Sequence, residues 1–193
     1  MKKVFVLFLI LFHHSFNLIA QANTPHVYNW NEVKNVPVDS VKAISFKKQK
    51  LSSLPPELAL YNQLVYLDLS FNKLEQLPSF LMQFNHLEKI DLSKNKFDSL
   101  PEIILQIPSI KYLILNRNQI SFLPETISQL VALSYLDLWD NPLKTFPDAF
   151  LMMPQLKQLH LEGILYGPKF QEKWKLALPN LKIFFDTPCD CRE

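Results

Sequence analysis

The sequence of 193 residues has little of several things that mark other classes of protein. Its two glycines argue against flexible linkers. Its two cysteines, Cys189 and Cys191, both lie in the segment PCDCRE at the C-terminal end. They cannot join distant parts of a fold, a bond between them would be strained, and a zinc site needs about four ligands. We interpret them as a tail pair without a role in folding, with bonding to each other or to another chain as the alternatives.

Motifs of catalysis are also missing. The chain has no glycine-rich phosphate loop, no H-E-x-x-H and no G-x-S-x-G. A catalytic site needs several functional groups that converge in a pocket, and no catalytic motif places such groups here. We therefore predict a protein that is not an enzyme.

One apolar run stands out, the nine residues Val4–Phe12, which follow Lys2 and Lys3 and precede an A-x-A site at residues 20–22. This arrangement is typical of a secretory signal peptide. The alternative is an uncleaved membrane anchor, but His13, His14 and Asn17 interrupt the run before the ~20 apolar residues of a spanning helix. We predict export without stable membrane insertion after cleavage. The pattern does not distinguish periplasm, cell surface and medium.

The chain has no large net charge. Removal of the signal takes the basic count from 20 to 18 against 18 acidic residues, so the mature chain is formally neutral. Nucleic-acid binding requires a basic stripe, and charges of both signs are interspersed along this sequence. We therefore do not expect a nucleic-acid partner.

The chain does have a repeat of 23 residues with the pattern L-x-x-L-x-L-x-x-N-x-L-x-x-L-P-x-x-L. Such a period with this leucine spacing predicts a solenoid of stacked coils. Strand alternation points the fourth and sixth residues of each unit inward and the third, fifth and seventh outward. We expect the asparagine to bond buried backbone groups of the turn and the proline to favour short turns over a long helix. The four clear copies are residues 64–86, 87–109, 110–132 and 133–155, with a looser copy at 41–63 and a decaying one from 156.

Both ends of the array depart from the pattern, as terminal units of a solenoid do because they cover its exposed edges. A short helix is predicted over Tyr28–Lys34, with Trp30 as a lid on the first coil and a surface role in binding as its alternative. A helix over Pro168–Leu178 and a strand over Leu181–Phe185 are predicted to close the other end, with Phe170, Trp174 and Phe184 as plugs. The predicted organisation is signal 1–22, N-terminal cap 23–40, repeat array 41–163, C-terminal cap 164–186 and tail 187–193.

On these motifs residues 41–185 resemble leucine-rich repeat proteins of the exported bacterial type. DSVKAISFKKQKLSSLP is similar to the opening repeat of that group, with Gln49 in the asparagine position, and EKWKLALPNLKIFFD is similar to its closing cap. The resemblance implies an α/β solenoid: a short horseshoe or arc with a parallel sheet on its concave face and short turns or 3-10 segments on its convex face. It also implies binding of other macromolecules without a cofactor, but it names no partner.

The outward strand positions predict a binding face on the concave side. Exposed aromatic residues there have no core to fill, and Tyr and Trp are enriched among residues that dominate interface energies. The alternative is that they only pack on one another across the strands. The candidate residues are Tyr66, Tyr112, Ile114, Tyr135, Asp137, Trp139 and His160.

Asp137, His160 and Glu162 come together in this reading. His and carboxylates can ligate a divalent metal, so a metal or acid–base site is one interpretation. The other is a polar rim that orients a ligand, which we prefer because neither ligand number nor geometry is secured.

These features favour an exported, non-catalytic protein that recognises a protein or peptide, including a host protein, on its concave face. The alternative is a self-assembling or envelope scaffold, that is, a homo-oligomer. Some bacterial repeat proteins carry a ubiquitin-ligase domain with a catalytic cysteine, but that domain needs a further globular unit beyond the short tail that holds Cys189.

Overall fold

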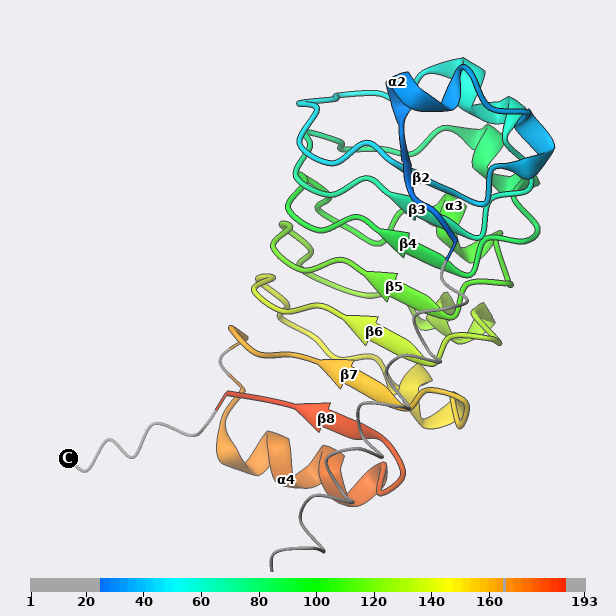
Figure 1. The fold of residues 1–193 in the computed structure, drawn as a ribbon. Coiled ribbons are helices and arrows are strands. Elements are labelled where there is room, and N and C mark those ends of the chain that lie inside the picture. Colours follow the sequence, from blue (N-terminus) through cyan, green and yellow to red (C-terminus); the bar gives the residue numbers. More distant parts are fainter. Residues whose placement is uncertain (1–24, 165, 187–193) are drawn as a thin grey trace, which may run out of the picture.

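The computed structural model describes residues 25–164 and 166–186. The predicted signal peptide and the cysteine pair lie outside these residues. Eight short strands form one parallel sheet in chain order, so the coils stack in sequence from the N-terminal to the C-terminal end (Figure 1). The strands are β1 (Tyr28–Asn29), β2 (Ala43–Ser45), β3 (Tyr66–Asp68), β4 (Lys89–Asp91), β5 (Tyr112–Ile114), β6 (Tyr135–Asp137), β7 (Gln158–His160) and β8 (Lys182–Phe184).

The predicted solenoid is confirmed by the register of this sheet. From β2 to β7 each residue pairs with the residue in the same repeat position of the next coil, as Leu67 does with Ile90 and Ile90 with Leu113. Inward residues of neighbouring strands therefore stack on inward ones. The fourth- and sixth-position leucines and isoleucines of the four clear copies are fully buried, and they join one core that runs the length of the solenoid.

The convex side is built from single turns, as the prolines predict. Each turn begins directly after the repeat proline, which fixes φ and has no N–H to donate. The prolines at 55, 78, 101, 124 and 147 are the N-caps of these turns. The turns are η2 (Pro56–Leu60), η3 (Ser79–Gln83), α3 (Glu102–Leu105), η4 (Glu125–Gln129) and η5 (Asp148–Met152).

The repeat asparagines bond the backbone inside the turn that follows each strand, which confirms their structural role. In the third coil the Asn95 amide donates to the carbonyls of Leu69 and Leu92, both at 3.0 Å, and its Oδ1 accepts from the N–H of Leu74 at 3.0 Å. Asn72, Asn118 and Asn141 repeat this arrangement. Each asparagine thus connects its own coil to the preceding one.

The eighth position of every repeat has a left-handed backbone, which the sequence pattern does not indicate. Only the sixth coil has a glycine there, although left-handed φ is costly for other residues. The chain tolerates it because the parallel ladder continues through this residue: the N–H of Phe71 donates to the carbonyl of Ser93 at 2.9 Å. The residues and their φ values are Lys48 (61°), Phe71 (59°), Lys94 (52°), Arg117 (55°), Asp140 (56°) and Gly163 (75°).

The N-terminal end adds a strand that the sequence did not predict. The predicted helix begins at Trp30, as α2 (Trp30–Val33), and Tyr28 and Asn29 instead form β1, which pairs with β2. Asn29 caps the helix, because its Oδ1 accepts from the N–H of Glu32 while the Glu32 carboxylate accepts from the Asn29 N–H. Trp30 lies 4.9 Å from Phe46, ring to ring, as expected for a lid. A further turn, η1 (Val38–Ser40), leads into β2.

At the other end the predicted helix and strand are present as α4 (Pro168–Ala177) and β8. Trp174 is buried, and it contacts Phe146 at 4.4 Å between ring centroids. Phe170 is half-buried beside it. Within the described residues no helix is long and apolar enough to span a membrane.

Candidate functional site

The concave face is formed by the third, fifth and seventh positions of the coils. The register places Tyr112, Tyr135 and Gln158 in one row across β5, β6 and β7. A second row holds Ile114, Asp137, His160 and Phe184 across β5 to β8. Trp139 follows Asp137 at the seventh position of its coil. Apolar and aromatic side chains therefore gather on the C-terminal half of this face.

We define the aromatic patch as Tyr112, Ile114, Tyr135, Trp139, His160 and Phe184. The Tyr112 and Tyr135 rings are 6.1 Å apart, and Tyr135 and His160 are 5.2 Å apart. Tyr112 is 45% exposed, while the other five side chains are half-buried. The rings of Tyr112, Tyr135, His160 and Phe184 thus form a continuous platform across β5 to β8, and Trp139 lies beside it at the seventh position.

Phe184 belongs to this platform, contrary to the prediction that it plugs the C-terminal cap. Its ring stacks on the His160 imidazole at 4.1 Å with an interplanar angle of 10°. The residue lies at the fifth position of the last strand, so strand alternation turns it to the concave side. The same alternation could have identified it in the sequence, had the last strand been read as one more coil.

Asp137 has a structural task on the face. Its Oδ1 accepts from the N–H of Trp139 at 3.0 Å, and its Oδ2 accepts from the Asn116 amide at 2.6 Å. Asp68 and Asp91 bond the N–H two residues on in the same way. The fifth-position aspartates therefore close the turn at the end of their strands.

Several outward positions in the N-terminal half are buried, among them two serines at the seventh position. Ser70 is 1% exposed and Ser93 is 6% exposed, although the alternation points both outward. Asp68 and Asp91 pair across β3 and β4. Burial raises the pKa of Asp91 above its ordinary value. The hydrogen bonds from Ser93 and the charge of Lys89 lower this pKa, while the charge of Asp68 raises it. This half of the face is therefore more polar than the aromatic patch.

Tyr66 lies apart from the aromatic patch, because Lys89 stands between it and Tyr112 in the row. The Lys89 ammonium lies 4.8 Å from the centre of the Tyr66 ring. Burial raises the pKa of Tyr66, and the charges of Asp68 and Asp91 raise it further. Burial also raises the pKa of Tyr135, and the charge of Asp137 raises it further. Both phenols stay protonated at neutral pH and can donate a hydrogen bond to a ligand.

The carboxylates near His160 do not converge on a point that would hold an ion. His160 Nδ1 lies 3.3 Å from Glu162 Oε1, while both oxygens of Asp137 accept bonds from Trp139 and Asn116. In the described part of the chain no group of three or more His, Cys, Asp or Glu side chains is arranged to bind a metal. The arrangement offers contact area and hydrogen bonds to a ligand.

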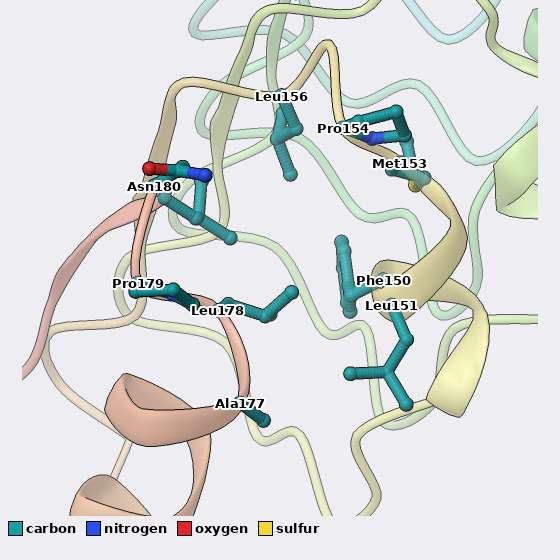
Figure 2. A pocket seen from close by; sticks show the side chains of 10 residues that line it. Phe150, Leu151, Met153, Pro154, Leu156, Ala177, Leu178, Pro179 and Asn180 are labelled. Atoms are coloured by element: carbon teal, nitrogen blue, oxygen red, sulfur yellow. The ribbon is translucent and has the colours of Figure 1, made fainter.

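A separate cleft lies between η5 and the end of α4. It has a volume of about 170 Å³ and is lined by apolar side chains, with Phe150 and Leu151 of η5 facing Leu178 and Pro179 (Figure 2). Asn180 is the one polar side chain that lines it. The cleft is the seam where the last repeat meets the cap, and it brings no catalytic groups together.

Comparison with known proteins supports this architecture. The family model described as leucine rich repeat matches residues 62–120, 85–143 and 108–163, which together span more than half of the chain. The chain belongs to the leucine-rich repeat family. Proteins of this family typically act as non-catalytic interaction modules. A search of the curated proteins gives no significant match.

Two solved structures show the same fold as this leucine-rich repeat protein. A leucine-rich repeat protein of Leptospira interrogans is 31% identical, with a TM-score of 0.66 over 76% of this chain and 38% of its own. An internalin of Listeria monocytogenes is 17% identical, with a TM-score of 0.59 over 82% of this chain and 51% of its own. This leucine-rich repeat protein therefore spans about two fifths of the first structure and half of the second.

Proposed function

We propose that this leucine-rich repeat protein is an exported recognition module that binds a protein or peptide, including a host protein, through its aromatic patch. The observation that carries the proposal is the continuous platform from Tyr112 to Phe184, which lies on the concave face outside the leucine core. Large aromatic side chains exposed together on a surface commonly mark an interaction site. Export rests on the signal-like sequence of residues 1–22.

Charges at the rim of the patch support selective binding. The Arg117 guanidinium lies 4.2 Å from the centre of the Trp139 ring and 3.5 Å from the Asp140 carboxylate. The guanidinium therefore holds the indole in place, and Arg117 and Asp140 together present both signs of charge beside it. Rim charges of this kind mainly set the orientation and the association rate of a partner.

The test is a double variant, Tyr112→Ala/Trp139→Ala, compared with the wild type as bait for envelope and host protein extracts. A captured partner is then titrated in purified form. We expect at least a ~30-fold loss of affinity, because a hot-spot residue contributes about 2 kcal/mol or more. Circular dichroism checks that the variant is folded.

The matched control is Phe122→Ala/Val131→Ala. These two apolar side chains are 51% and 67% exposed and lie outside the concave strand positions. Their removal should change the affinity less than twofold. Equal binding by the wild type and the concave variant, or equal loss in both variants, would refute the proposed site.

Self-assembly is a second candidate, and one observation favours it. Leu151, Met152 and Leu176 are 51%, 77% and 75% exposed near the C-terminal end of the solenoid. Apolar surface of this kind can join copies of a chain. If assembly occurs, we expect the mass in solution to rise with protein concentration, and Met152→Ser/Leu176→Ser should remove this dependence. If it does not occur, the mass should stay that of the monomer.

A further inference from the structure

A group of lysines gathers at the C-terminal ends of the first strands, away from the aromatic patch. We define the lysine edge as Lys47, Lys48, Lys50, Lys73 and Lys94. Four of them are exposed and Lys94 is half-buried. Among the described residues, none of these five ammonium groups lies within ion-pair distance of a carboxylate. The neutral total charge of the mature chain therefore conceals a local excess of positive charge.

The repeat geometry produces this gathering. Lys48 and Lys94 occupy the left-handed eighth position on either side of Phe71, and backbone bonds stack these three residues coil on coil. Lys50 and Lys73 share the tenth position of adjacent coils, where the Lys73 N–H donates to the Leu51 carbonyl at 2.8 Å. Neighbouring coils are about 4.8 Å apart, so the charges form a stripe across the coils.

Three of the ammonium groups converge on one ring. Those of Lys47, Lys48 and Lys94 lie 5.5, 5.2 and 4.1 Å from the centre of the Phe71 ring. Each is attracted to the ring by its quadrupole, but the three cations repel one another across distances comparable to the ~8 Å screening length of physiological salt. An anion bound between them would relieve this repulsion. Phe71 therefore organises a site with positive charge in excess.

We propose that the lysine edge binds an extended acidic polysaccharide whose sulfate or carboxylate groups repeat along the chain. A stripe of separate ammonium groups suits a polymer with regularly spaced charges, since lysine acts as a point charge and lacks the planar fork with which arginine clamps a single phosphate. The Phe71 ring is engaged by ammonium groups, so it offers no free stacking platform for a nucleic-acid base. This site is separate from the aromatic patch and does not depend on the function proposed for it.

The test uses heparin, a sulfated polysaccharide, as the probe for the full protein. Titrations at several salt concentrations should show binding that weakens as salt rises. Lys48→Gln/Lys94→Gln should weaken heparin binding at least tenfold and flatten its salt dependence. Lys157→Gln/Lys169→Gln removes the same charge from exposed lysines at the C-terminal end and should change the affinity less than twofold.

Phe71→Leu tests the organising role of the ring, because it keeps every charge. We expect an intermediate loss of heparin affinity with an unchanged circular dichroism spectrum. Equal weakening by the two lysine variants would overturn the proposal, since binding would then follow total charge. The proposal would also be overturned if DNA or anionic phosphatidylserine vesicles bound as tightly as heparin. The same holds if the wild type did not bind heparin at physiological salt.

Discussion

Replacement of a repeat asparagine by alanine should cost more stability at Asn141 than at Asn118, although the two side chains make the same kinds of bond. Both amides donate to the sixth-position leucine carbonyl of their own coil and to that of the preceding coil. Each leucine carbonyl inside the array therefore accepts from two asparagines. The array ends differently, because Ile164 stands where the next asparagine would be.

The expected magnitudes follow from counting the groups left without a partner. In Asn118→Ala the carbonyls of Leu92 and Leu115 keep Asn95 and Asn141, and the one group left unpaired is the Phe97 N–H. A buried unpaired group costs about 1–3 kcal/mol, so we expect a loss of about 2–3 kcal/mol with the other lost bonds included.

In Asn141→Ala two groups lose their partner. These are the Ile120 N–H, which donates to Asn141 Oδ1 at 3.1 Å, and the Leu138 carbonyl, which accepts from the Asn141 amide at 2.9 Å. Both residues are buried. We therefore expect a free energy of unfolding about 1–2 kcal/mol lower than that of Asn118→Ala.

Urea unfolding measures the difference, with the midpoint and slope followed by circular dichroism and tryptophan fluorescence. Coincident transitions are required, because repeat arrays can unfold in parts. Asn85→Ala removes an exposed amide and should change stability by less than about 0.5 kcal/mol. Equal losses for Asn118→Ala and Asn141→Ala would show that sharing of the leucine carbonyls does not determine the stability of the turns.

Three further predictions concern single residues. Burial raises the pKa of Asp91 in the folded chain, so the wild type should lose stability as pH rises through that pKa. Asp91→Asn removes the charge and should therefore be more stable than the wild type at pH 7, as measured by urea titration. Gly163→Ala should lower the free energy of unfolding by about 1–3 kcal/mol, because φ is 75° and a Cβ would meet the Asp140 backbone at 3.0 Å. Gly167→Ser is the control: its Cβ has free space, and the serine should be neutral or stabilising as the N-cap of α4. Mass spectrometry of the exported protein should find Asn23 as its first residue, and an intact N-terminus would contradict the predicted signal cleavage.

The sequence was sufficient to predict the solenoid, because each repeat carries the residues for its own core, turn and bend. Leu67, Asn72 and Pro78 each have one structural task, and the 23-residue period repeats that task in the next coil. The rows of the concave face follow from the same period. For this reason the sequence alone places Tyr112 and Tyr135 side by side, and their rings are neighbours in the structure.

Features that depend on backbone conformation or on contacts between unlike coils could not be predicted in this way. The left-handed backbone at Phe71 has no glycine to mark it, so the lysines that meet at its ring look interspersed in the sequence. The prediction that Phe184 plugs the cap is wrong because the cap breaks the 23-residue period, and it is this period that tells concave-face positions from core positions. The sequence also does not reveal that Ser70 is buried and that its hydroxyl donates to the Asp68 carboxylate.

The bonds between coils connect residues whose separation stays constant along the array. The asparagine amides reach 26 residues back to a carbonyl and accept from an N–H 21 residues back, in every coil from Asn72 to Asn141. A duplication or loss of 23 residues therefore restores the same partners at the new junction, whereas other small changes in length do not. Unequal recombination within such a gene would yield foldable chains at once. The concave surface can accordingly gain or lose one row at a time, and its outward residues can diverge while the framework stays fixed.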